Sequence, residues 1–283
     1  MNDDSAIRNP NSAFLYPRLF LTFARNSLIR DMMFRSNFWI EVVSSMAYML
    51  LNLAFYLIVY QYTDEVAGWT KYEFFVFVST TMFVNSLMQA FFMPNAAELS
   101  ELVRTGGLDF ALLKPIDTQF LVSLRKMSWS SLGNFCVAAV VMVWALSRLE
   151  GRPDGWAPFL LYPLYVVSGV LILYSVMVTL ASTSIWLGRN QTLYDYWFYI
   201  TNLSRYPMEI YHGSMLGDAI AVAFTFILPI LVVINVPARV MAKPLDASQL
   251  PLAAFAVLAT VLSLLGSRWV FRQALNSYRS ASS

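Results

Sequence analysis

Six apolar blocks, most of them close to 20 residues long, constrain what this chain can fold into. They cover residues 38–61, 72–93, 128–146, 158–187, 216–236 and 251–271. A helix needs about 20 apolar residues to cross the roughly 30 Å hydrocarbon layer of a bilayer. The blocks are continuous rather than alternating, which favours helices over a membrane barrel. Only 13% of the residues are charged, whereas soluble domains carry about 25%. The sequence therefore predicts an all-α membrane protein with six transmembrane helices.

The segment ahead of the first block, residues 14–35, mixes apolar and basic side chains. On a helical wheel one half carries Leu19, Phe20, Phe23 and Leu28, and the other positions include Arg18 and Arg25. This pattern predicts an amphipathic helix in the headgroup region, with its arginines attracted to anionic membrane lipid. An ordinary basic flank is the alternative. The predicted organisation is a cytoplasmic tail with this interfacial helix (1–37), a transmembrane domain (38–271) and a cytoplasmic C-terminal tail (272–283).

Lysine and arginine are distributed unevenly between the two sides of the predicted spans. With the N-terminus inside, the cytoplasmic side holds fourteen: Arg8, Arg18, Arg25, Arg30, Arg35, Arg104, Lys114, Arg125, Lys126, Arg189, Arg205, Arg268, Arg272 and Arg279. The other side holds five: Lys71, Arg148, Arg152, Arg239 and Lys243. Positive residues accumulate on the cytoplasmic side of membrane proteins. We therefore expect both termini, the polar loop 94–117 and the polar loop 188–213 to be cytoplasmic.

Several classes of function are disfavoured by the residue inventory. The chain has one histidine and one cysteine, too few for a metal cluster of these residues or a catalytic pair. It contains no H-E-x-x-H, no G-x-S-x-G and no G-x-x-x-x-G-K-[ST] phosphate loop. The basic residues flank spans instead of forming a nucleic-acid patch. We expect no catalytic, cofactor-binding or metal-binding residues and no nucleic-acid partner.

Four uncharged amide side chains fall at depth in the predicted spans: Asn52, Asn85, Gln89 and Asn134. Asn85 and Gln89 are spaced i, i+4 and share one helix face. Hydrogen bonding between helices is one interpretation, and it is the commoner use of amides in spans. The other is that the four line a translocation path. Charged residues are missing from the span centres, which speaks against an ion- or proton-driven transporter.

The polar loop 94–117 lies between the second and third spans. Residues 96–103 predict a short helix that includes Glu98 and Glu101, and the pair Gly106 and Gly107 ends it. A rigid helical knob held between two spans is suited to transmit force from a soluble partner. A simple hairpin loop is the alternative.

The residues of this loop resemble the cytoplasmic signature of type-2 ABC exporter permeases. ELVRTGGLDFALLKPID is similar to that family's acidic residues, Arg-x-Gly-x-Leu-(Asp/Glu)-x-x-Leu and basic-Pro pair. The matching positions are Glu98, Glu101, Arg104, Gly106 or Gly107, Leu108, Asp109, Leu113, Lys114 and Pro115. SRYPMEIYHG (204–213), NVPARVM (235–241) and the C-terminal RWVFRQALNSYRSASS are similar to a six-span subgroup of these permeases.

This resemblance implies a second permease subunit, of the same or a related chain, and cytosolic ABC ATPase subunits that carry ATP and Mg²⁺. The ATPase-coupling residues it implies are Glu98, Glu101, Arg104, Gly106, Gly107, Leu108 and Asp109, with a lesser contact at Arg205, Tyr206 and Pro207. It places the protein in the plasma (inner) membrane of a prokaryote.

The sequence and this resemblance together favour a transmembrane permease subunit of an ABC exporter that moves an amphipathic or apolar substrate. The chain itself is not expected to be an enzyme. An autonomous secondary transporter or channel is the first alternative, and a membrane-bound scaffold is the second.

Overall fold

Helices form nearly all of the computed structural model, which describes residues 12–151, 155–187, 191–244 and 249–278. The described residues exclude 1–11 and 279–283 of the predicted tails. They also exclude four arginines of the charge count: Arg8, Arg152, Arg189 and Arg279. The elements are α1 (Ser12–Met33), α2 (Arg35–Tyr62), β1 (Glu65–Val66), β2 (Trp69–Thr70), α3 (Lys71–Phe91), α4 (Met93–Arg104), α5 (Gly107–Leu112), α6 (Thr118–Leu124), α7 (Leu132–Arg148), α8 (Ala157–Leu187), α9 (Gln191–Asn202), η2 (Leu203–Arg205), η3 (Met208–Tyr211), α10 (Met215–Val222), η4 (Ala223–Ile227), α11 (Ile230–Ala242) and α12 (Leu250–Ser277).

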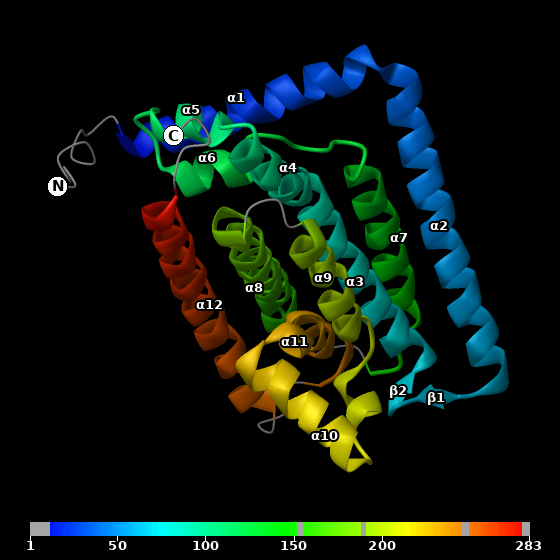
Figure 1. The fold of residues 1–283 in the computed structure, drawn as a ribbon. Coiled ribbons are helices and arrows are strands. Elements are labelled where there is room, and N and C mark those ends of the chain that lie inside the picture. The colour runs from blue at the N-terminus through cyan, green and yellow to red at the C-terminus, as the bar shows by residue number, and fades with distance from the viewer. Residues whose placement is uncertain (1–11, 152–154, 188–190, 245–248, 279–283) are drawn as a thin grey trace.

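The molecule has two ends, between which the long helices run (Figure 1). At one end, the hairpin end, the antiparallel strands β1 and β2 connect α2 to α3. The opposite end carries α4, α5 and α6, and we call it the coupling end. Helix α1 lies across the coupling end, crosswise to α2 (Figure 1).

Most of the predicted spans are recovered as helices. Among the described residues, α2, α3 continued by α4, α8 and α12 are long and apolar enough to cross a membrane. Helix α7 has 17 residues and also runs from the coupling end to the hairpin end (Figure 1). These elements correspond to predicted spans one, two, three, four and six. The chain is therefore an all-α membrane protein.

The fifth predicted span, residues 216–236, differs from the prediction. Here α10 and the π-helical turn η4 meet α11 at a bend of 85°. The break falls at Leu228 and Pro229, where the backbone leaves the helical region and proline has no N–H to continue a helix. Beyond α11, Lys243 Nζ donates to Gly68 O of the hairpin at 2.9 Å. Helix α10 also starts at the hairpin end (Figure 1). The bent pair α10–α11 therefore begins and ends at the same end of the molecule.

Residues 191–211, predicted as part of a loop, run from the coupling end to the hairpin end instead. Helix α9 packs against α8 and α4 near the coupling end, and Trp197 Nε1 donates to Leu173 O at 3.4 Å. At the other end of this segment, Glu209 Oε2 accepts from Trp69 Nε1 of the hairpin at 3.2 Å. The segment contains charged residues and many tyrosines, so its mean hydropathy is too low to mark it as a span. The prediction that residues 188–213 form a loop on the same side as 94–117 is thereby corrected.

The centre of the bundle is α8, which contacts α12, α11, α9 and α4, while α3 pairs with α7. Helices α2 and α12 are only slightly buried and present large apolar side chains outward, including Leu51, Phe55 and Leu265. Such surfaces suit contact with lipid or with another apolar surface. Gly169 of α8 is where α11 comes closest, because a Cβ there would lie 2.6 Å from Val233 O.

We predict that Gly169→Ala destabilises the protein by roughly 1–3 kcal/mol, because the backbone of α11 must move to admit the methyl group. Gly266→Ala is the matched control: it is also inside a long helix, and a Cβ there meets nothing within 4 Å. Thermal unfolding in detergent measures both. Equal midpoints for the two variants would contradict the close α8–α11 packing.

Candidate functional site

The coupling end is built around α4, which follows α3 after a break at Phe92. Helix α4 includes the helix predicted at 96–103, and it buries Leu99 against the bundle. Thr105 caps it, and Gly106 follows with φ of +72°, a left-handed conformation that glycine adopts at little cost. Helix α5 begins at Gly107 and buries Leu108. The glycine pair therefore ends the helix as the sequence predicts.

Glu101 and Arg104, predicted to contact an ATPase, pair with each other. Arg104 Nε donates to Glu101 Oε2 at 2.8 Å, and Arg104 Nη2 donates to the second carboxylate oxygen. Both side chains are about half exposed, at 51% and 47%. The coupling end thus presents a preformed pair of opposite charges to solvent.

The other predicted coupling residues surround this pair. Glu98 forms an ion pair with Lys126 at 2.8 Å and lines a cavity of about 250 Å³ between α4, α5 and α6. Phe110 also lines it and is 73% exposed. Burial raises the pKa of the Tyr278 hydroxyl, and the nearby carboxylate of Asp109 raises it further. These contacts place Asp109 beside the end of α12.

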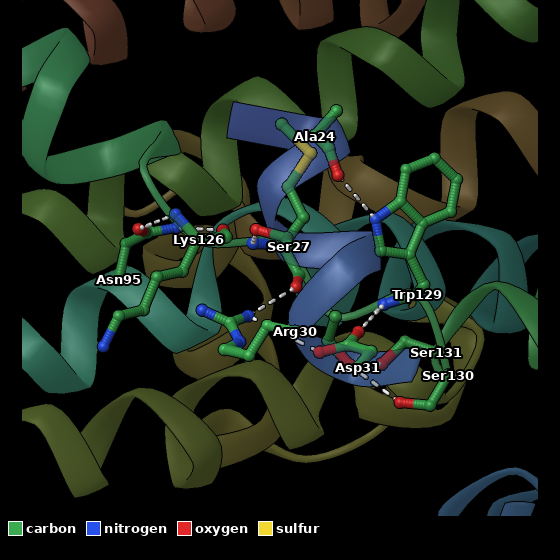
Figure 2. Close-up of polar contacts among 11 residues, drawn as sticks. Ala24, Ser27, Arg30, Asp31, Asn95, Lys126, Trp129, Ser130 and Ser131 are labelled. Carbon is green, nitrogen blue, oxygen red and sulfur yellow. Dashed lines mark hydrogen bonds and ion pairs between the residues drawn. The ribbon is translucent and has the colours of Figure 1, made fainter. Parts of the chain in front are cut away.

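Asn95 fastens α4 to the segment that follows α6 (Figure 2). Its side chain is 1% exposed and makes three hydrogen bonds. The Nδ2 group donates to Phe91 O at 2.9 Å and to Lys126 O at 2.7 Å, and Oδ1 accepts from Lys126 N at 2.8 Å. One amide therefore satisfies both backbone groups of Lys126, which fixes the distance between the two segments.

The same segment is clamped by α1 (Figure 2). Met127 N donates to Ser27 Oγ at 3.0 Å, and Arg30 Nη2 donates to Met127 O at 3.1 Å. Trp129 donates its backbone N–H to Asp31 Oδ2 at 3.1 Å and its indole N–H to Ala24 O at 3.0 Å. On the predicted amphipathic helix, the half-buried face includes Leu19, Phe20 and Phe23, whereas Arg18 and Arg25 are exposed. Leu28, also assigned to the apolar half, is 38% exposed, so most but not all of the predicted apolar face of α1 turns toward the protein.

Asp117 joins α6 to α12. Its Oδ1 caps α6 by accepting from Phe120 N at 2.9 Å, and it also accepts from Arg268 Nη1 at 3.0 Å. Burial raises the pKa of Asp117, but the hydrogen bonds from Arg268 and Phe120 and the charges of Arg268 and Arg272 outweigh it, so the net pKa is lowered. The carboxylate is therefore held in its charged form.

A second cavity, of about 220 Å³, lies between α2, α3, α7 and the η2 segment. We call it the amide cavity. Its lining residues are Ser45, Tyr48, Met49, Asn52, Tyr56, Val78, Thr81, Met82, Asn85, Gln89, Asn134, Arg205 and Tyr206. All four amides predicted for a translocation path are among them. Sequence spacing alone could pair only Asn85 with Gln89; the fold adds Asn52 from α2 and Asn134 from α7.

The four amides are used in two ways. Asn134 is buried and accepts from Ser45 Oγ at 3.1 Å, so it holds α7 to α2. Asn52 Nδ2 donates to Tyr48 O of its own helix at 2.8 Å. Asn85 and Gln89 make no side-chain hydrogen bond to another described residue, and both face the cavity. Asn134 therefore serves helix packing, whereas the side chains of Asn85 and Gln89 are open to the cavity.

The structure separates Arg205, Tyr206 and Pro207 from the coupling end. They lie in the segment that crosses toward the hairpin end, where Met208 N donates to Asn235 Oδ1 at 2.9 Å. Arg205 and Tyr206 line the amide cavity, and Pro207 is buried. The structure therefore does not bring the predicted second contact onto one surface with Glu98–Asp109.

The spacing of polar and tyrosine residues in two predicted spans is a further sequence signal for this cavity. On α2, Tyr48, Asn52 and Tyr56 recur at four-residue intervals, as Thr81, Asn85 and Gln89 do on α3. Each set lies on one helix face.

Within the described residues no group of three His, Cys, Asp or Glu side chains could hold a metal ion.

We predict that Asn95→Ala lowers stability by about 2 kcal/mol, because it leaves the N–H and C=O of Lys126 without their partner in a buried site. Asn202→Ala is the control, since Asn202 is exposed at the end of α9. Thermal unfolding in detergent compares the two. A midpoint unchanged by Asn95→Ala would refute the fastening role.

The Asp117–Arg268 pair predicts a pH dependence. A carboxylate with a lowered folded-state pKa contributes stability above its unfolded pKa and loses it as the pH falls through the folded value. Asp117→Asn keeps the cap but loses the charge, so we expect it to unfold about 1 kcal/mol more easily at pH 7. The difference from the wild type should shrink as the pH falls below the ordinary value of 3.8. A difference that is constant from pH 7 to pH 3 would contradict the role of this charge.

Most of the chain matches the model of a known protein family. The family model described as ABC-2 family transporter protein matches residues 46–282. No curated protein and no solved structure matches the chain. The matched region includes the amide cavity and the coupling end, apart from Ser45 and α1.

Proposed function

Since the chain belongs to the ABC-2 family of transporter proteins and is a transporter permease, we propose that it is the transmembrane subunit of an ATP-driven exporter. The observation that carries the proposal is the amide cavity, which lies between helices of the family's membrane domain and gathers all four amides. Polar side chains facing a cavity between spans are typical of a substrate path. The substrate is proposed to pass along this cavity.

We place the ATPase contact at the coupling end. The half-exposed pair of Glu101 and Arg104 and the exposed Phe110 offer both charges and an aromatic anchor to a soluble partner. Gly106 and Gly107 shape the turn between α4 and α5. ATP and Mg²⁺ would be held by that partner.

Movement of α4 would reach the cavity through α3. The two helices are separated only by Phe92, and α3 supplies Asn85 and Gln89 to the cavity wall. Closure of the ATPase dimer would favour one arrangement of the permease over another, because the partner contacts differ between the two.

The coupling end is proposed to face the cytoplasm of a prokaryotic cell, in its plasma membrane. Arg104, Lys114, Arg125 and Lys126 all lie at this end, which agrees with the bias of basic residues toward the cytoplasmic side. The apolar outward faces of α2 and α12 are available for lipid and for a second permease subunit of the same or a related chain.

The charge swap Glu101→Arg with Arg104→Glu tests the coupling assignment. The double variant can form the same ion pair in reverse, so it inverts the charges shown to a partner while retaining the local pairing. We expect at least a tenfold loss of co-purifying ATPase and of ATP-driven transport in liposomes, with expression retained.

Glu65→Arg is the control, because Glu65 is exposed at the hairpin end and should leave ATPase binding unchanged. Full ATPase binding by the charge-swapped variant would contradict the assignment of Glu101 and Arg104 to the ATPase contact. Transport by the permease alone, driven by an ion gradient in liposomes without ATPase, would support the autonomous transporter instead.

A further inference from the structure

The amide cavity contains one charged side chain among its lining residues, that of Arg205. No described carboxylate forms an ion pair with it, although four other arginines of the described chain form such pairs: Arg30, Arg104, Arg239 and Arg268. Arg205 shares the cavity with Tyr56, which lies six residues, or about 9 Å, before the end of α2. Arg205 is therefore set back from the hairpin end, and it is exposed, so its guanidinium is open to a bound molecule.

The wall of the amide cavity combines charged, apolar and amide side chains. Arg205 and Tyr206 come from the η2 segment, and Asn85 and Gln89 come from the half of α3 nearer the coupling end. Met49, Val78 and Met82 supply apolar surface in the same cavity. The distance along α3 from Val78 to Gln89 is about 16 Å, long enough for an extended molecule.

We infer that the amide cavity binds an anionic amphiphile, whose oxyanion head pairs with Arg205 and whose apolar part lies along Met49, Val78 and Met82. A guanidinium pairs with oxyanions through two parallel hydrogen bonds, which are stronger than bonds between neutral groups. The amides of Asn85 and Gln89 can donate to and accept from uncharged polar groups on the same molecule. This inference rests on the proposed transport function and names the class of its substrate.

The test uses the whole permease, purified alone in a neutral maltoside detergent, with radiolabelled dodecyl phosphate as the probe. Binding is measured by scintillation proximity and corrected for uptake into empty micelles. We expect Arg205→Gln to weaken binding about tenfold or more, and Arg205→Lys to retain most of it. Arg148→Gln should bind as the wild type does, because Arg148 is exposed at the end of α7 and does not line the cavity.

A second variant keeps the test decisive if Arg205→Gln folds poorly. Asn85→Trp fills the cavity from α3 while Arg205 stays in place, so it too should abolish binding. Wild-type affinity in either folded variant would overturn the inference. Displacement of the probe by dodecyltrimethylammonium as readily as by dodecyl phosphate would do the same, because it removes the preference for an anion. Displacement of the probe by millimolar inorganic phosphate alone would show that the site binds free oxyanions. It would overturn the inference that the ligand is an amphiphile.

This outcome is independent of the coupling assignment. The binding assay contains no ATPase, and Arg205 lies away from the coupling end, so Arg205→Gln should still co-purify with the ATPase at the wild-type level. Loss of binding with normal ATPase association supports the inference. Loss of ATPase association in the charge-swapped variant with normal probe binding concerns only the proposed coupling.

Discussion

The three hydrogen bonds of Asn95 hold together the coupling end of the molecule, and the contacts of α4 with the rest of that end depend on them. They join the start of α4 to the backbone of Lys126, and that same short segment is bound by Ser27, Arg30 and Asp31 of α1. Without this join, α4 would be a mobile arm at the end of α3. With it, α1, α4 and the segment before α7 form one rigid plate, stabilised by buried polar groups that have no water to replace their partners.

The plate is connected to the membrane helices by a second polar network around α6. Asp117 accepts from Arg268 of α12, while Gln119 donates to Tyr174 of α8 at 3.1 Å. These contacts attach the coupling end to α8 and α12, and the Phe92 break attaches it to α3. A force applied at Glu101 or Arg104 by a partner bound as proposed would reach three long helices at once, and only α3 among them lines the amide cavity.

Hydropathy and local signals in the sequence predicted much of this fold. Continuous apolar blocks predict α2, α3, α7, α8 and α12, and the glycine pair predicts the end of α4. Hydropathy could not predict that residues 191–211 run between the two ends of the molecule while residues 216–236, the predicted fifth span, bend back. Hydropathy reports preference for lipid, whereas the tyrosines and charges of the first segment lower its mean hydropathy below that of a span, and α11 is apolar because it is buried in the bundle. The amides were identified from their depth, but Arg205 was assigned to a loop because a charge normally marks a boundary of a span.

The position of the Phe92 break determines how a tilt of α3 is distributed along the cavity. Gln89 is about 4.5 Å from the pivot and Val78 about 21 Å from it, along the helix axis. A tilt of about 10° would therefore move Gln89 by less than about 1 Å and Val78 by about 4 Å. The cavity would widen as a wedge, with its narrow edge at the amides and its broad edge near Arg205. For a cargo bound as proposed, such a lever would free the parts near Arg205 and Val78 first, while the polar groups at Asn85 and Gln89 would still be held.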